Sequence, residues 1–131
     1  MLYKKRRKYK YNLHSEEYFE TGLSVGNPKD LGFVTITQDG ILTVKKSYAW
    51  DGPSGPTIDT KTFMRGSLIH DALYQLIRER VLPMSDRERA DQILKEVCLQ
   101  EGMPNWRAWY VYKVVRLAGA SSANPDLLTA P

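Results

Sequence analysis

The stretch of sequence that decides the fold spans residues 62–80, TFMRGSLIHDALYQLIRER. Its apolar residues recur at the three- and four-residue spacing of a helix that buries one face. A helix is therefore predicted from about Thr62 to about Arg80, before Pro83. The stripe that faces the core is expected to hold Gly66, His70, Leu73, Tyr74, Ile77 and Val81. Asp71 lies on the flank of this stripe.

A second helix is predicted after a short connection. Ser85 followed by Glu88 three positions later is typical of a capping box, and Gly102 is a typical helix end. Asp91 lies at the edge of an apolar face, in line with Arg87. That face is formed by Ala90, Ile93, Leu94, Val97 and Cys98.

A third helix is predicted to follow Pro104 and to be closed by Gly119. Its core-facing side chains are expected to be Trp106, Trp109, Tyr110, Val114 and Leu117, and its outward ones Arg107, Lys113 and Arg116. Burial of the tryptophans in the core is the favoured interpretation. Contact of an amphipathic aromatic helix with a membrane is the alternative.

The N-terminal half has the pattern of strands. Residues 9–13 alternate in polarity, and residues 33–37 and 41–44 flank Gln38-Asp39-Gly40, which is typical of a hairpin. We therefore predict an α+β fold: a small N-terminal antiparallel sheet with a hairpin, a Gly/Pro-rich loop, and three packed helices. The predicted single domain consists of a basic arm (1–10), the sheet (11–49), the loop (50–61), the helical part (62–119) and a tail (120–131).

The bulk composition sets limits on the class of protein. The chain has 131 residues and is 42% hydrophobic, which suits one globular domain. It contains no apolar run long enough to span a membrane. The basic, tyrosine-rich start does not resemble a signal peptide. Cys98 stands alone, which excludes an internal disulfide framework. These features predict folding in a reducing cytoplasm.

The net charge of +4 is local. Six of the nineteen basic residues lie in the first ten positions, which leaves thirteen basic against fifteen acidic residues elsewhere. Such an arm can dock on an acidic protein surface, an anionic lipid surface or nucleic acid, or it can simply be solvated. No motif of a nucleic-acid-binding fold accompanies it. The arm residues are Lys4, Lys5, Arg6, Arg7, Lys8 and Lys10.

Residues 50–59, WDGPSGPTID, form a loop constrained by two glycines and two prolines. The candidate ligand-binding residues in it are Asp51, Gly52, Ser54 and Asp59. An ordinary connection between sheet and helix is an equally good interpretation.

The most function-like feature is the pairing of His70 with Asp91, which the short connection should make neighbours on antiparallel helices. A carboxylate on a core-facing stripe is costly unless paired, and a histidine is its natural partner. The carboxylate would fix the tautomer of the imidazole and leave the other nitrogen as a base for water. Tyr74, one turn after His70, is expected to support Asp91. The same side chains, with Arg87, can equally form a buried network that only fixes packing.

Four ordered motifs resemble an uncharacterised domain family of tailed bacteriophages and prophages. They are the Asp-Gly-x-Ser-x-Pro loop at 51–56, the His-Asp-x-x-Tyr helix at 70–74, the Arg-x-x-x-Asp helix at 87–91, and Val-Arg-x-x-Gly at 115–119. The likeness covers about residues 40–119, and the chain departs from it at Gly55-Pro56. It implies a phage or prophage origin, synthesis in the cytoplasm of a bacterial host with incorporation into a virion as an option, and a phage structural protein as a candidate partner of the basic arm. It implies no particular activity.

The glycine-rich loop followed by His-Asp-x-x-Tyr and a distant Asp is also similar to secretory calcium-dependent phospholipases. This likeness implies His70 as the base, Asp91 as the residue that orients it, Tyr74 as a support, and Asp71 as a ligand of a divalent cation, calcium above all. Asp59 is a further candidate ligand, because oxygen ligands suit calcium or magnesium. The chain lacks the disulfide cysteines of that family, and its loop spacing differs.

Three functions follow as hypotheses. The first is a phage-encoded, metal-dependent hydrolase of an ester in lipid or cell-envelope material. The second is a non-catalytic virion or tail accessory module in which the polar cluster is structural. The third is a small protein that interacts with the host.

Overall fold

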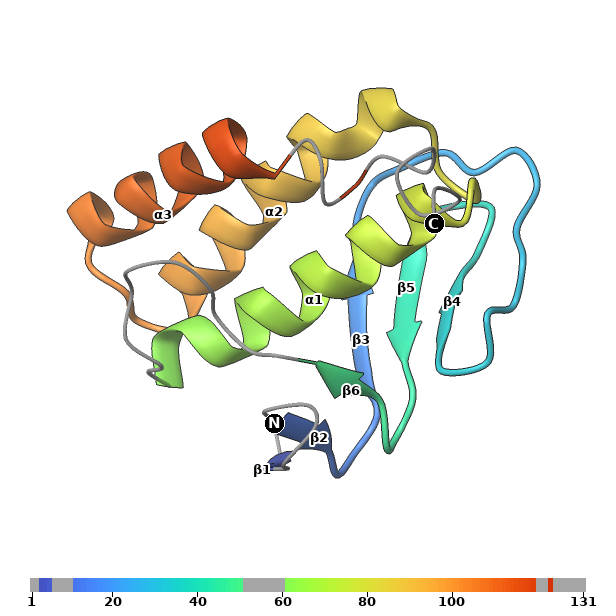
Figure 1. The fold of residues 1–131 in the computed structure, drawn as a ribbon, viewed down its shortest axis with the longest axis horizontal. Coiled ribbons are helices and arrows are strands. Elements are labelled where there is room, and N and C mark those ends of the chain that lie inside the picture. The colour runs from blue at the N-terminus through green and yellow to red at the C-terminus, as the bar shows by residue number, and fades with distance from the viewer. Residues whose placement is uncertain (1–2, 6–10, 51–60, 120–122, 124–131) are drawn as a thin grey trace, which may run out of the picture. The chain divides into compact units, whose positions relative to one another are not determined.

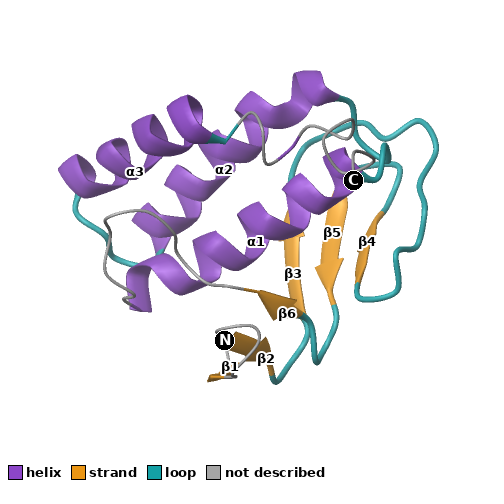
Figure 2. Ribbon diagram, viewed as in Figure 1, coloured by secondary structure: helices purple, strands orange, loops and turns teal. Residues whose placement is uncertain are grey.

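The computed structural model describes residues 3–5, 11–50, 61–119 and 123 of the chain. The chain divides into two compact units, Met1–Gly52 and Pro53–Pro131. Among the described residues the strands belong to the first unit and the three α-helices to the second, as Figure 2 shows. The predicted α+β class is therefore confirmed.

The first unit contains two three-stranded antiparallel sheets where the sequence predicted one. One sheet has the order β1-β2-β6 and the other β3-β5-β4. The strands are β1 (Tyr3–Lys5), β2 (Tyr11–Leu13), β3 (Glu17–Glu20), β4 (Val34–Ile36), β5 (Ile41–Val44) and β6 (Ala49–Trp50). Lys4 and Lys5 of the predicted arm belong to β1, which pairs with β2.

The predicted hairpin is present. Val34 pairs with Val44 and Ile36 with Leu42 in antiparallel register, and the amide of Gly40 donates to the carbonyl of Thr37 across 3.0 Å. Gly40 has a φ of 88°, in the left-handed region that glycine adopts without strain. The sequence interpretation missed β1, which it placed in the basic arm. It also missed β3, which begins and ends in glutamate, and β6, which has only two residues.

The second unit consists of α1 (Lys61–Arg78), the 3₁₀ turn η1 (Met84–Asp86), α2 (Arg87–Gln100) and α3 (Asn105–Ala118). In Figure 1, α1 and α2 lie side by side and α3 lies along α2. Gly102 ends α2 as predicted: it has a φ of 101°, and the amide of Met103 donates to the carbonyl of Cys98 across 2.9 Å. No helix in the described part of the chain is long and apolar enough to cross a bilayer.

The start of α2 corrects the predicted capping box. Ser85 lies inside η1, and neither η1 nor α2 has a side-chain hydrogen bond at its cap. The backbone makes the turn itself, because the amide of Asp86 donates to the carbonyl of Pro83 across 3.0 Å.

The predicted orientation of α3 is wrong. Its buried residues are Ala108 and Val111, which join a core cluster with Phe63, Leu94, Cys98 and Met103. Four of the five side chains expected inside are instead exposed, by 71% for Trp106, 49% for Trp109, 41% for Tyr110 and 88% for Leu117. The fifth, Val114, is partly buried. Small side chains on the buried face allow α3 to approach the other helices closely, which the tryptophans would prevent.

Candidate functional site

His70, Tyr74 and Asp91 meet between α1 and α2, as the sequence predicted. Nε2 of His70 lies 2.6 Å from Oδ1 of Asp91, and the hydroxyl of Tyr74 donates to the same oxygen across 2.6 Å. The rings of His70 and Tyr74 are 4.1 Å apart at their centroids. The spacing of one helical turn places both donors on the same face of α1, opposite the carboxylate.

Two arginines complete the network around Asp91. Nη1 of Arg116, on α3, lies 2.9 Å from Oδ2, and Nη1 of Arg87 lies 3.5 Å from the same oxygen. Arg87 also donates to the carbonyls of Val115 and Arg116, each across 3.4 Å. The carboxylate thus ties all three helices together, and the solvent-accessible fraction of Asp91 is zero.

The surroundings keep Asp91 ionised. Burial alone would raise its pKa, but the hydrogen bonds from His70 and Tyr74, the charge of His70 and the hydrogen bond from Arg116 hold the pKa below its usual range. Burial, followed by the hydrogen bond to Asp91 and its negative charge, raises the pKa of Tyr74. Tyr74 is therefore a neutral donor across the physiological pH range.

Of the two ring nitrogens of His70, Nε2 is hydrogen-bonded to Asp91, and Nδ1 makes no hydrogen bond with the described residues. No fully enclosed side-chain nitrogen or oxygen among the described residues lacks a partner, and His70 is 7% exposed. Nδ1 therefore lies at the small exposed edge of the ring.

Two glycines provide the space that this geometry needs. A Cβ at Gly66, one turn before His70, would lie 2.9 Å from Sγ of Cys98 and 3.0 Å from Cδ1 of Leu94. A Cβ at Gly119 would overlap the hydroxyl of Tyr74. The absent side chains let α1 approach α2 and let the end of α3 approach Tyr74.

Sequence reasoning missed the role of Arg116, which it placed on the outside of α3. The side chain instead turns toward Asp91. The available signal was the Val-Arg-x-x-Gly motif: the carbonyl of Val115 accepts from Arg87, Arg116 donates to Asp91, and Gly119 leaves room for Tyr74.

The predicted loop and metal residues are placed only in part. Asp51, Gly52, Ser54 and Asp59 lie outside the described residues. Asp71 is partly buried on α1, next to His70. Within the described ranges there is no group of three or more His, Cys, Asp or Glu side chains that could hold a metal ion.

Two other features of the helical unit stand apart from the network. Cys98 is buried, and burial raises the pKa of its thiol to about 12, so it is a packing residue and not a nucleophile at neutral pH.

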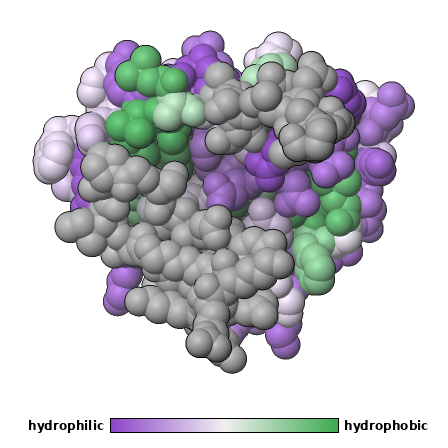
Figure 3. Space-filling model, in the orientation of Figure 1, coloured by the Kyte–Doolittle hydropathy of each residue, from purple (hydrophilic) through white to green (hydrophobic). Residues whose placement is uncertain are grey.

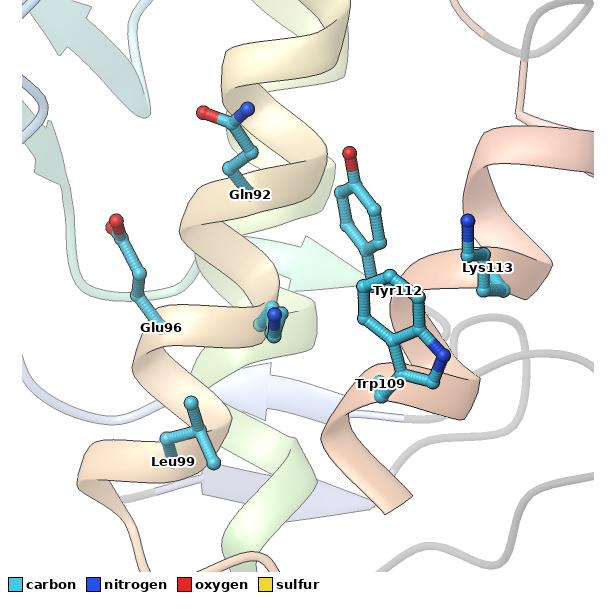
Figure 4. A pocket seen from close by; sticks show the side chains of 7 residues that line it. Gln92, Glu96, Leu99, Trp109, Tyr112 and Lys113 are labelled. Carbon is cyan, nitrogen blue, oxygen red and sulfur yellow. The ribbon is translucent and has the colours of Figure 1, made fainter. Parts of the chain in front are cut away.

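A surface groove between α2 and α3 is lined in part by Gln92, Glu96, Trp109 and Tyr112, and His70 does not line it (Figure 4).

Comparison with known proteins assigns the chain to a family. Residues 30–115 match the family described as "Protein of unknown function (DUF1353)". Searches of curated proteins and of solved structures found no match. The matched range spans more than half of the chain and contains four of the five network side chains, His70, Tyr74, Arg87 and Asp91, while Arg116 follows it directly. The chain therefore belongs to the DUF1353 family of proteins of unknown function.

Proposed function

We propose that the protein is a phage- or prophage-encoded hydrolase of an ester in lipid or cell-envelope material, with His70 as the general base. The observation that carries this proposal is the 2.6 Å contact between Nε2 of His70 and the carboxylate of Asp91. A carboxylate only accepts hydrogen bonds, so Nε2 carries a proton. In the neutral ring the lone pair is then on Nδ1, the nitrogen that makes no hydrogen bond with the described residues.

This arrangement suits the transfer of a proton from water. Nδ1 of His70 would take a proton from a water molecule while the water oxygen bonds to the ester carbonyl carbon. The tetrahedral intermediate then expels the alcohol, which receives the proton back from Nδ1. Asp91 would stabilise the charged imidazolium between these two transfers, because it stays ionised.

A divalent cation beside Asp71 remains part of the proposal. Asp71 follows His70 directly in α1, and the other predicted ligand, Asp59, lies outside the described residues. If bound there, calcium would polarise the carbonyl of the substrate.

An ester-hydrolysis assay of His70→Gln tests the proposal. Wild type and variants would be assayed on soluble carboxylic esters and on phospholipids, with and without calcium. We expect His70→Gln to reduce the rate by at least about a hundredfold, since a general base contributes roughly 10²–10⁴. His14→Gln is the matched control, because His14 is exposed on the first unit. Equal rates for wild type and a folded His70→Gln would refute the proposal.

The hydrogen bonds that both carboxylate oxygens of Asp91 accept from the protein favour a second candidate function. All its contacts are donors from the protein itself, and His70 is almost enclosed. Such a network can serve only to fix three helices, as in a virion or tail accessory module. In that case His70→Gln and Asp91→Asn would lower the melting temperature, and the wild type would hydrolyse none of the esters.

A further inference from the structure

The outward face of α3 carries large apolar side chains that are exposed to solvent. Trp106, Trp109, Tyr110 and Leu117 follow the helical spacing of a single stripe, opposite the buried Ala108 and Val111. In Figure 3, hydrophobic surface gathers over the C-terminal end of α3, with hydrophilic surface beside it. A stripe of this kind on a folded unit usually marks an interaction site.

Two lysines lie against the aromatic side chains of this face. Of the three basic residues of α3, Lys113 is one of these two, whereas Arg116 turns toward Asp91. Glu96 of α2 lines the groove beside Trp109 and is paired with Arg89. Nζ of Lys113 lies 4.5 Å from the ring centroid of Trp109, and Nζ of Lys95, from α2, lies 4.8 Å from the same centroid. Figure 4 shows Trp109 and Lys113 projecting from α3 on the same side of the helix. The face is therefore aromatic and cationic together.

The combination of aromatic side chains and lysine fits a membrane surface better than a protein partner. The core of a protein–protein interface is depleted in lysine, because a buried ammonium group needs an acidic partner. At a membrane surface, the ammonium group of Lys113 can extend to the phosphate groups while its aliphatic stem lies among apolar groups. Tryptophan and tyrosine prefer the same boundary region, and leucine enters the hydrocarbon.

We propose that α3 binds the surface of an anionic phospholipid bilayer, with Trp106, Trp109, Tyr110 and Leu117 inserted between the head groups and Lys113 paired with phosphate. Basic residues near such a surface add electrostatic attraction. This inference does not depend on the hydrolase proposal, because none of these five side chains belongs to the His70–Asp91 network.

Vesicle binding by the full chain tests the inference. The protein would be mixed with extruded vesicles of phosphatidylglycerol and phosphatidylcholine in equal parts, or of phosphatidylcholine alone, and co-sedimentation and tryptophan emission would be recorded. We expect co-sedimentation and a blue shift with the anionic vesicles, both of them weaker at high salt. Leu117→Ser should weaken binding about tenfold, as expected for the loss of one inserted apolar side chain. Lys113→Gln should weaken it as well and reduce the salt dependence.

Phe33→Ser is the matched control, because Phe33 is 53% exposed but belongs to the first unit. It should leave vesicle binding unchanged, and melting curves would show that all variants are folded. The inference is overturned if the folded wild type binds neither vesicle or if Leu117→Ser and Phe33→Ser behave alike. Self-association that Leu117→Ser abolishes, without vesicle binding, would instead make this face a contact between copies of the chain.

Discussion

Asp91 is the single residue that all other members of the network contact. Every group that contacts its carboxylate is a donor. In Asp91→Asn one oxygen becomes an NH₂ group that faces donors, and the arginines lose their counter-charge. We expect a loss of about 3 kcal/mol or more in the free energy of unfolding, the scale of a broken buried ion pair. Chemical denaturation would measure it, and a loss below about 0.5 kcal/mol would contradict a structural role.

The same residue makes the protein sensitive to acid. The folded state holds the pKa of Asp91 below its ordinary value of 3.8. Its contribution to stability is therefore complete above that value and is lost as the pH falls through the lower pKa of the folded state. The difference in melting temperature between wild type and Asp91→Asn should shrink as the pH falls below about 4. A difference that grows on acidification would contradict this assignment.

Gly119 lies outside the network, but its missing side chain leaves the space that the hydroxyl of Tyr74 occupies. In Gly119→Ala the new methyl group would overlap the hydroxyl of Tyr74, which must then move away from Asp91. We expect a loss of about 1–3 kcal/mol in the free energy of unfolding, typical of an overpacked site. Gly26→Ala is the control, since nothing lies within 4 Å of a Cβ there. Equal stability of the two variants would show that Tyr74 is not held in place by Gly119.

Among the secondary-structure elements, the close approach of α1 to α2 depends on Gly66. Gly66→Ala should raise the helix propensity of α1 by about 1 kcal/mol. The clash with Cys98 and Leu94 should outweigh this gain and lower the stability overall. The double variant Gly66→Ala, Cys98→Ala should recover part of the loss, because the sulfur that lies 2.9 Å from the new methyl group is gone. Strict additivity of the two substitutions in thermal denaturation would argue against this contact.

Polar contacts at its C-terminal end help to set the rotation of α3 about its own axis. Hydrophobicity alone favours buried tryptophans, but the helix rests on Ala108 and Val111. Arg87 holds the carbonyls of Val115 and Arg116, and Arg116 reaches Asp91. These polar contacts favour one rotation of α3, and the aromatic stripe consequently faces outward.

For the whole molecule, a titration tests whether a divalent cation binds at Asp71. Calcium, magnesium and zinc would be titrated calorimetrically into the wild type and into Asp71→Asn, with Asp30→Asn as a control on the first unit. We expect calcium to bind the wild type and Asp30→Asn, and Asp71→Asn to lose binding, because oxygen ligands suit calcium. Wild type that binds none of the ions would remove the cation from the proposed mechanism and favour the accessory-module function.

The sequence by itself determined those features that depend on local spacing. The α1 stripe, the face of α2 that carries Asp91, the hairpin at residues 34–44 and the helix end at Gly102 follow from periodicity and turn chemistry. The contact between His70 and Asp91 was predictable because a short connection forces two amphipathic helices to be neighbours, and a buried carboxylate requires a partner.

Only the tertiary structure decided how α3 and Arg116 take part. Periodicity shows that a helix has an apolar stripe, but it does not say whether that stripe or the opposite face meets the core. That choice depended on how closely backbones can approach at Ala108 and Gly119, and on which donors reach Asp91. Arg116 and Asp91 are 25 positions apart in the chain, and Gly119 and Tyr74 are 45 apart. The energies of such contacts depend on distances that a linear sequence does not contain.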